Sequence, residues 1–361
     1  MNTAPSFASS AVLVAEREIG TKLRSKAFVL SFAFLFVAAL VAVVWGGMQA
    51  RETPVTHLAV TADAQSALPA VDGFEITGVA DRTAAEDQVL TGEVDAAVVA
   101  DSSSPLGYAL LVESDFPGPL VLALSQQPPV EVLDPAAADP LLRYFVALGF
   151  GLVFFMSAML FGTTIAQSVV EEKQTRVIEL LLSAIPARAL LAGKVIGNTV
   201  LAMGQILVLG AIVVVGLTVT DQTTLLTGIG APLAWFAIFF LFGFVLLAAL
   251  YAGAAAMVSR QEDLGATSTP LMLLVMLPYF AVIFFNSNPT VLTVMSYVPF
   301  SAPVGMPMRL FLGEAQWWEP LVSLGILAVT CVGAIIVGAK IYENSLLRMG
   351  SRVTLREALH A

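Results

Sequence analysis

The chain has 361 residues, of which 58% are hydrophobic and 12% are charged, and its mean hydropathy is +0.86. A soluble domain carries about 25% charged residues, so this composition excludes an ordinary soluble protein. The net charge of −10 is unevenly distributed, because residues 50–141 carry fifteen acidic and two basic side chains. We expect an α-helical membrane protein with one acidic domain and no nucleic acid among its partners.

The chain begins with a segment that we expect to lie in the membrane interface. Residues 1–26 place Leu13, Ile19 and Leu23 at helical spacings with basic residues between them, which is typical of an interfacial amphipathic helix. A first transmembrane helix is predicted over 27–46. A cleaved signal peptide is the alternative, but the apolar run is longer than a usual h-region and shows no clear small-x-small cleavage site.

Six windows without Asp, Glu, Lys, Arg or His are long enough to cross a membrane as helices, which needs about 20 residues. Backbone polar groups in lipid must be hydrogen-bonded within the segment, so helices are the expected structure. The windows are Ala27–Trp45, Tyr144–Ala166, Val195–Thr218, Trp235–Val258, Ala266–Phe285 and Pro320–Ala339. Residues 142–340 are thus expected to hold five of the six spans, with an outer loop over Asp221–Gly230.

Residues 50–141 are expected to form a small α/β extracytoplasmic domain between the first and second spans. Segments rich in Val, Ile and aromatic residues predict strands, and their alternation with helical segments favours an α/β unit. The predicted strands are His57–Ala62, Phe74–Ala80, Val94–Ala100 and Tyr108–Glu113, and the predicted helices are Thr83–Leu90 and Leu120–Ser125. Four prolines between 128 and 140 indicate a stiff return to the membrane.

A mixed-charge segment over 168–186 follows the second span and is predicted to contain a short amphipathic helix. Glu171 and Glu172 are expected at its start, where acidic side chains complement the positive end of a helix, and Glu172 is correctly spaced to pair with Arg176. The pattern allows two interpretations, a helix lying on the bilayer or a lever that docks on a soluble ATPase. The candidate coupling residues are Glu171, Glu172, Thr175, Arg176, Glu179, Leu180 and Leu181.

Two further segments connect the later spans. A short loop on the same side as the mixed-charge segment presents Arg260, Gln261 and Glu262. Residues 286–319 are apolar but repeatedly interrupted by proline, so we expect an outer hairpin of one or two short helices, or a re-entrant hairpin, rather than a seventh span. Residues 341–361 are expected to form a cytoplasmic tail.

The distribution of basic residues predicts the orientation. Thirteen of the 17 Lys and Arg residues fall on the side that carries both termini, and four fall on the other side. Because Lys and Arg gather on the cytoplasmic side of a membrane, we expect a multi-pass protein of the plasma (inner) membrane with both termini in the cytoplasm.

The sequence shows no catalytic motif. It lacks a P-loop, a His-Glu-x-x-His and a Gly-x-Ser-x-Gly, and it has only two histidines, so we expect no enzyme activity, metal site or cofactor on this chain. Carriers usually place ionisable residues inside their spans, whereas these six windows hold neutral polar groups. Thr163, Asn198 and Gln205 are candidates to line a path or to join helices by hydrogen bonds, and a sodium site built from such oxygens stays open.

The run from Val170 to Gly197 resembles the signature of type-2 ABC export permeases. In that family an acidic pair, a small polar residue, a Glu-Leu-Leu and a Pro precede a Gly-Lys that enters the next span. These parts fall here on Glu171, Glu172, Thr175, Glu179, Leu180, Leu181, Pro186, Gly193 and Lys194. The order of segments is also similar to that family, and most similar to the sodium-efflux permease NatB branch, although the acidic domain is short for that branch.

The resemblance implies the membrane subunit of an ATP-driven exporter. ATP and Mg would then be bound by a separate ABC ATPase subunit, and the transporter would include a second permease copy or a paralogue in the lipid bilayer. Substrates consistent with the family are Na+, drug-like compounds, peptides and lipids. The alternative function is a membrane sensor or scaffold whose acidic outer domain detects a ligand.

Overall fold

Apolar helices dominate the structure, a computed structural model that describes residues 6–49, 56–65, 74–101, 104, 107–113, 140–346 and 354–360. Six of these helices are long and apolar enough to cross a membrane, and a small sheet lies between the first and second of them in the chain. The predicted fold class is therefore confirmed. The chain divides into a helical unit, residues 1–47 with 136–361, and a sheet unit, residues 48–135.

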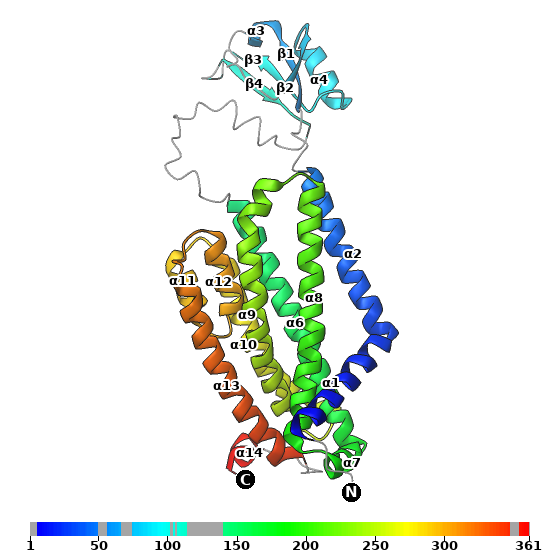
Figure 1. Cartoon of the computed structure of the whole chain (residues 1–361). Helices are drawn as coiled ribbons and strands as arrows, with labels where there is room; N and C mark the ends of the chain where they lie inside the picture. The colour runs from blue at the N-terminus through cyan, green and yellow to red at the C-terminus, as the bar shows by residue number, and fades with distance from the viewer. Residues whose placement is uncertain are drawn as a thin grey trace. The chain divides into compact units, whose positions relative to one another are not determined.

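The helical unit is a bundle of long helices with shorter helices at its ends. Figure 1 shows α6, α8, α9, α10 and α13 running side by side, with α1, α7 and α14 gathered at one end, which we call the α7 end. The elements are α1 (Phe7–Arg24), α2 (Lys26–Gln49), α6 (Pro140–Gln174), α7 (Val177–Ala184), α8 (Ala187–Val219), α9 (Thr223–Ala256), η1 (Gln261–Asp263), α10 (Leu264–Phe284), α11 (Pro289–Tyr297), α12 (Ala302–Phe311), α13 (Glu319–Leu346) and α14 (Leu355–His360).

Aromatic side chains at helical spacing hold α6 against α9. The ring of Phe150 lies 4.9 Å from that of Phe236, and the ring of Phe154 lies 5.9 Å from that of Phe240. Aromatic pairs at such distances add about 0.5–1.5 kcal/mol beyond the area they bury. Because both helices repeat Phe every four residues, the contact continues along one face of each, and the two helices form the centre of the bundle.

The helices extend well beyond the apolar windows. The 33 residues of α8 measure about 50 Å at about 1.5 Å per residue, whereas the hydrocarbon core is about 30 Å thick. The predicted outer loop over Asp221–Gly230 is also wrong in extent, because α9 begins at Thr223. Charged residues flanking the windows are thus part of the spanning helices, and several of them are buried.

The mixed-charge segment differs from its prediction. Glu171 and Glu172 lie in the last turn of α6 and not at the start of a new helix, which is α7 and begins at Val177. The two helices are separated at Arg176, whose φ of 56° is left-handed and does not continue an α-helix. The expected Glu172–Arg176 pair is replaced by contacts from Glu172 to two other helices, and these partners let α6 continue past its apolar window.

The proline-rich segment 286–319 contains two short helices, α11 and α12, as one of the predicted alternatives had it. A buried ion pair joins α12 to the start of α13: Arg309 Nη2 lies 2.9 Å from Glu319 Oε2, and Arg309 is only 4% exposed. The Tyr297 hydroxyl, at the end of α11, donates to Glu319 Oε1 at 3.0 Å. Arg309, which lies in the predicted outer hairpin, is therefore an internal structural residue.

The sheet unit contains a four-stranded sheet with the order β2-β1-β3-β4. Its strands are β1 (Thr56–Thr61), β2 (Phe74–Val79), β3 (Ala96–Ala100) and β4 (Tyr108–Leu111), close to the predicted segments. The first three pair in parallel and β4 is antiparallel to β3.

Side chains alternate between the two faces of this sheet, as strand geometry requires. Leu58 and Val60 face α3 (Ala62–Gln65), while Ala59 faces α4 (Arg82–Leu90), close to the predicted helix over Thr83–Leu90. Asp81 caps α4 by accepting a hydrogen bond from the Ala84 backbone at 2.9 Å. The helix predicted over Leu120–Ser125 lies outside the described residues.

Candidate functional site

Helix α7 presents apolar side chains to the surroundings of the helical unit. Leu180 is 73% exposed and Val177 is 38% exposed, while Ile178 on the opposite face is fully buried and anchors the helix to the bundle. Leu181 is half-buried, and Glu171, Thr175, Arg176 and Glu179 are exposed beside it. Most of the predicted coupling residues therefore form one accessible surface at the α7 end, which we call the α7 surface.

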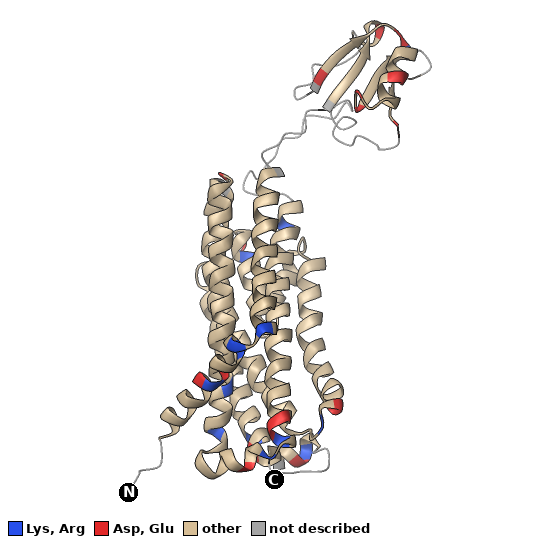
Figure 2. Ribbon diagram, turned by 90° about the vertical axis from the view of Figure 1, so that its right-hand side faces the viewer, with Lys and Arg blue, Asp and Glu red and all other residues tan. Residues whose placement is uncertain are grey.

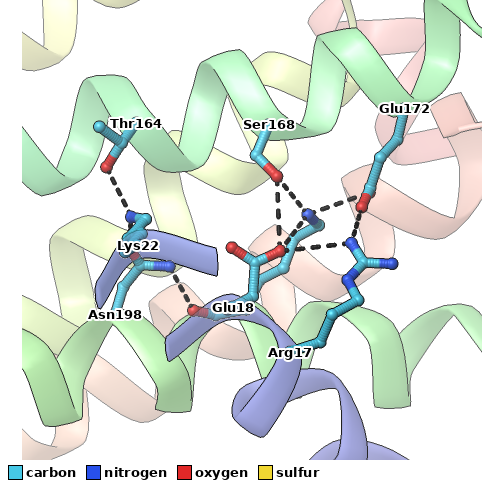
Figure 3. A network of polar contacts seen from close by, with 8 residues as sticks. Arg17, Glu18, Lys22, Thr164, Ser168, Glu172 and Asn198 are labelled. Carbon is cyan, nitrogen blue, oxygen red and sulfur yellow. Dashed lines mark hydrogen bonds and ion pairs between the residues drawn. The ribbon is translucent and has the colours of Figure 1, made fainter. Parts of the chain in front are cut away.

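Glu172 does not belong to the α7 surface, because it is buried behind it. Its carboxylate pairs with Arg17 of α1 and lies 3.0 Å from the Lys194 ammonium of α8. Lys194 also lies 2.8 Å from Glu18 Oε1 and donates to the Ser168 hydroxyl at 2.6 Å. Figure 3 shows Arg17 and Glu18 of α1 directed toward Ser168 and Glu172 of α6. We call Arg17, Glu18, Ser168, Glu172 and Lys194 the buried ion cluster.

The neighbouring charges favour the charged forms of Glu18 and Arg17. Burial raises the pKa of the Glu18 carboxyl, but the charge and hydrogen bond of Lys194, together with the charges of Lys22 and Arg17, outweigh burial, so the pKa lies below its usual value. Burial lowers the pKa of Arg17, while the hydrogen bonds and charges of Glu172 and Glu18 together more than offset it. Opposite charges thus compensate one another, as buried charges require.

Lys22 extends the polar contacts along α1. Its ammonium donates to the Thr164 hydroxyl at 2.8 Å and to the Asn198 side-chain oxygen, and it lies 5.5 Å from the centre of the Phe161 ring. Burial lowers the pKa of Lys22 to about 8, more than the nearby Glu18 charge raises it. Asn198 donates to the Lys194 carbonyl of its own helix at 2.8 Å, and its bond with Lys22 joins α8 to α1.

Two glycines of the signature bring α1 against α8. A Cβ on Gly193 would lie 2.6 Å from the Ala11 carbonyl oxygen, and one on Gly197 would lie 3.0 Å from the Ala15 carbonyl oxygen. Small residues permit this close backbone approach between helices. The Gly-Lys of the signature therefore has two structural tasks, since Gly193 admits α1 and the neighbouring Lys194 binds its Glu18.

The structure separates the other predicted residues. Thr163 and Gln261 line one hollow of about 290 Å³ between α6 and α10, whereas Gln205 is buried at 2% exposure on α8 and is absent from this hollow. Arg260 and Glu262 form an exposed ion pair of 3.1 Å beside η1. The predicted path-lining residues are therefore not brought together. Within the described ranges, no group of three or more His, Cys, Asp or Glu side chains is arranged to hold a metal.

Sequence reasoning missed Glu18, Lys22, Ser168 and Lys173 as internal residues. Charged residues near the ends of apolar windows are usually solvated or interfacial, and their partners here lie far away in the chain. Figure 2 shows Lys and Arg of the helical unit concentrated toward the α7 end, where several are buried against acidic residues. One sequence feature could have indicated their burial: acidic and basic residues both occur next to the apolar windows.

Comparison with known proteins identifies relatives over most of the chain. A family model described as "ABC-2 family transporter protein" matches residues 26–340. The chain is 29% identical over 211 residues to the uncharacterized protein YhaP of Bacillus subtilis, covering 55% of this chain and 50% of that protein. It is 27% identical over 224 residues to the uncharacterized protein MJ1024 of Methanocaldococcus jannaschii, covering 61% and 54% respectively. The chain thus spans about half the length of these relatives. No solved structure matches.

Proposed function

Because the chain belongs to the ABC-2 family of transporter proteins, we propose that it is the membrane subunit of an ATP-driven exporter in the plasma (inner) membrane. A separate ABC ATPase would bind ATP and Mg and dock on the α7 surface in the cytoplasm, where both termini also lie. A second copy of the chain or a paralogue completes the transporter. The proposed cargo is Na+, a drug-like compound, a peptide or a lipid, and the NatB-like branch remains part of this proposal.

The observation that carries the proposal is the exposed apolar face of α7. A short amphipathic helix that presents Val177 and Leu180 is suited to lie in a groove of a protein partner. Its other face is fixed to the bundle through Ile178, and the buried ion cluster lies directly behind it. A force applied to α7 is therefore passed to the bundle, as an energy-coupling element requires.

The α7 surface also sharpens the choice of test residue. Leu180→Asp places a charge in the centre of the apolar face, and it should not disturb folding because Leu180 is largely exposed. We expect it to reduce co-purification of the ATPase at least tenfold, equivalent to about 1.4 kcal/mol of binding free energy. The measurement is quantitative pull-down of a candidate ABC ATPase from the same organism, co-expressed with this chain.

The matched control is Leu90→Asp, an equally exposed leucine on α4 of the sheet unit. It should leave co-purification at the wild-type level. Wild-type amounts of ATPase bound to a correctly inserted Leu180→Asp variant would reject the docking role of α7. Failure of the wild-type chain to bind any ATPase would instead favour the sensor or scaffold.

A further inference from the structure

Lys173 is a buried lysine that lies between the ends of three long helices. It belongs to the last turn of α6 and is 1% exposed. Its ammonium donates to the Ala256 carbonyl at 2.7 Å and to the Ser345 carbonyl at 2.9 Å. Within the described part of the chain these are its hydrogen bonds, and no carboxylate forms an ion pair with it.

Both acceptors are carbonyls at helix C-termini. Ala256 is the last residue of α9, and Ser345 lies in the last turn of α13. Carbonyls at these positions have no partner within their helix and carry the negative end of the helix dipole. Two such ends directed at one ammonium replace the carboxylate that a buried lysine normally needs.

The two helices that Lys173 joins already touch closely one to two turns away. Gly253 of α9 faces Gly338 of α13, where a Cβ on Gly338 would lie 2.7 Å from the Ala249 carbonyl oxygen. The contact between Lys173 and the two carbonyls lies beyond this crossing, at the α7 end. It therefore links the final turns of α9 and α13 on the far side of the crossing.

The neighbouring residue Glu172 holds two other helices. It pairs with Arg17 of α1 and Lys194 of α8, so adjacent side chains in one turn of α6 are bonded to four helices. Three residues after Lys173, the left-handed Arg176 ends α6 and α7 begins. A displacement of α7 acts on α6 directly through this turn, while its connection to α8 runs through Ile185 and Pro186.

The α13 side of the contact also holds unsatisfied polar groups. The hydroxyls of Tyr342 and Ser345 are buried and have no hydrogen-bond partner among the described residues. Buried polar groups are normally paired, and an exception calls for an explanation. The explanation we infer is a second arrangement of these helix ends, in which the two hydroxyls form hydrogen bonds.

We propose that Lys173 is the positioning residue through which displacement of α7 reaches α9 and α13. Withdrawal of its ammonium from the Ala256 and Ser345 carbonyls releases the two helix ends, and its return draws them together. The inference rests on the proposed function, because a partner must move α7. It assigns the transmission to a single side chain whose contacts can be broken without touching the α7 surface.

The first experiment tests the contact in the full-length chain without an ATPase. Cys331→Ser removes the native cysteine, and Arg260→Cys with Lys340→Cys places spin labels at exposed positions after α9 and on α13. Adding Lys173→Met should give a longer and broader distance distribution in nanodiscs than the labelled parent. The matched control is Lys22→Met, which removes a half-buried lysine whose hydrogen bonds, within the described residues, go to α6 and α8, and it should leave the distribution unchanged.

The second experiment tests transmission in the complex with the ATPase. Trapping with ADP and vanadate should shift the 260–340 distance in the parent, and Lys173→Met should abolish this shift. A label pair at Ser183→Cys and Lys340→Cys should still report movement of α7 in the same variant. An unchanged 260–340 distribution in the first experiment, or a normal shift on trapping, would overturn the role of Lys173.

A second variant covers the case in which Lys173→Met is poorly folded. Inserting Gly-Ser between Thr175 and Arg176 preserves the Lys173 contacts but makes the connection to α7 flexible. The complex should still form, and the trapping shift at 260–340 should be lost; a retained shift would overturn the proposal. Absence of any ATPase from the wild-type complex is a different result, because it rejects the proposed function itself.

Discussion

Lys194 is the residue on which the buried ion cluster depends. It is fully buried and lies within 3.0 Å of carboxylate oxygens from both α1 and α6. Each carboxylate has Arg17 as a further neighbour, but Arg17 is partly exposed and lies 3.5 Å from Glu18. The lysine of the Gly-Lys signature is thus explained as an internal counter-ion.

We predict that Lys194→Met strongly destabilises the protein. The substitution leaves the carboxylates of Glu18 and Glu172 buried without their main positive partner. Removing one partner of a buried ion pair lowers the free energy of unfolding by about 3–5 kcal/mol. The expected result is a clearly lower Tm in detergent, measured by intrinsic fluorescence or light scattering. Arg188→Gln is the control, because its ion pair with Glu343 is exposed, and it should leave the Tm unchanged; equal Tm values for the two variants would contradict the prediction.

Glu172 shows what residue-level reasoning from the sequence could not reach. Its position in an acidic pair beside a polar helix is typical of a solvated or docking residue. Its partners lie 155 positions away at Arg17 and on the next long helix at Lys194. Whether a charged side chain is buried depends on such distant partners, whereas the local sequence pattern depends only on residues that are neighbours in the chain.

At the scale of elements, α1 is part of the bundle through its contact with α8. The sequence predicted its existence and amphipathic character from apolar spacing. It did not predict which face is buried, and the structure buries Ala11, Val14 and Ala15 while exposing Leu13 and Leu23. The buried face of α1 is the one with small residues, because these residues allow close packing against the glycines of α8.

We predict that Gly193→Ala loosens α1 from the bundle. The added Cβ meets the Ala11 backbone carbonyl, and a change of rotamer cannot relieve that clash, so we expect a loss of about 1–3 kcal/mol. The measurement is the rate of trypsin cleavage after Arg17 in detergent, which should rise several-fold.

Gly204→Ala is the matched control for this prediction on the same helix. A Cβ at Gly204 has no atom within 4 Å, and replacing a helical glycine by alanine stabilises by up to about 1 kcal/mol. Cleavage should therefore be unchanged or slower. Faster cleavage in Gly204→Ala than in Gly193→Ala would show that α1 is held by something other than this crossing.

At the scale of the whole molecule, the two units have different chemical characters. Most basic residues belong to the helical unit and most acidic residues to residues 50–141. Basic residues favour the cytoplasmic side, and this asymmetry supports the proposed topology with the sheet unit outside. The topology is the premise of the docking proposal, because an ATPase has access only from the cytoplasm.

We predict that a membrane-impermeant maleimide labels the two units from opposite sides. In a Cys331→Ser background, Thr91→Cys in the exposed C-cap of α4 should react in intact cells. Thr175→Cys, exposed at the end of α6, should react only after the membrane is permeabilised. Labelling of Thr175→Cys in intact cells would reverse the orientation and remove the basis for an ATPase at α7.

From the sequence alone follow the six spans, the alternating strands of the sheet unit and the family resemblance. These features arise from hydrophobic length and periodicity, which are properties of contiguous residues. The proline-rich segment 286–319 was also correctly limited to short helices, because proline restricts the backbone locally.

Tertiary structure alone decided the roles of the charged residues at the α7 end. Glu172, Lys173 and Lys194 all lie in or just after the mixed-charge segment of the sequence. Glu172 nevertheless pairs with α1 and with Lys194 of α8, and Lys173 donates to carbonyls of α9 and α13. Whether such a side chain faces water or a buried partner depends on helix length and on the crossing of distant helices. Those quantities come from packing, since the energy of a buried charge is set by the groups that surround it.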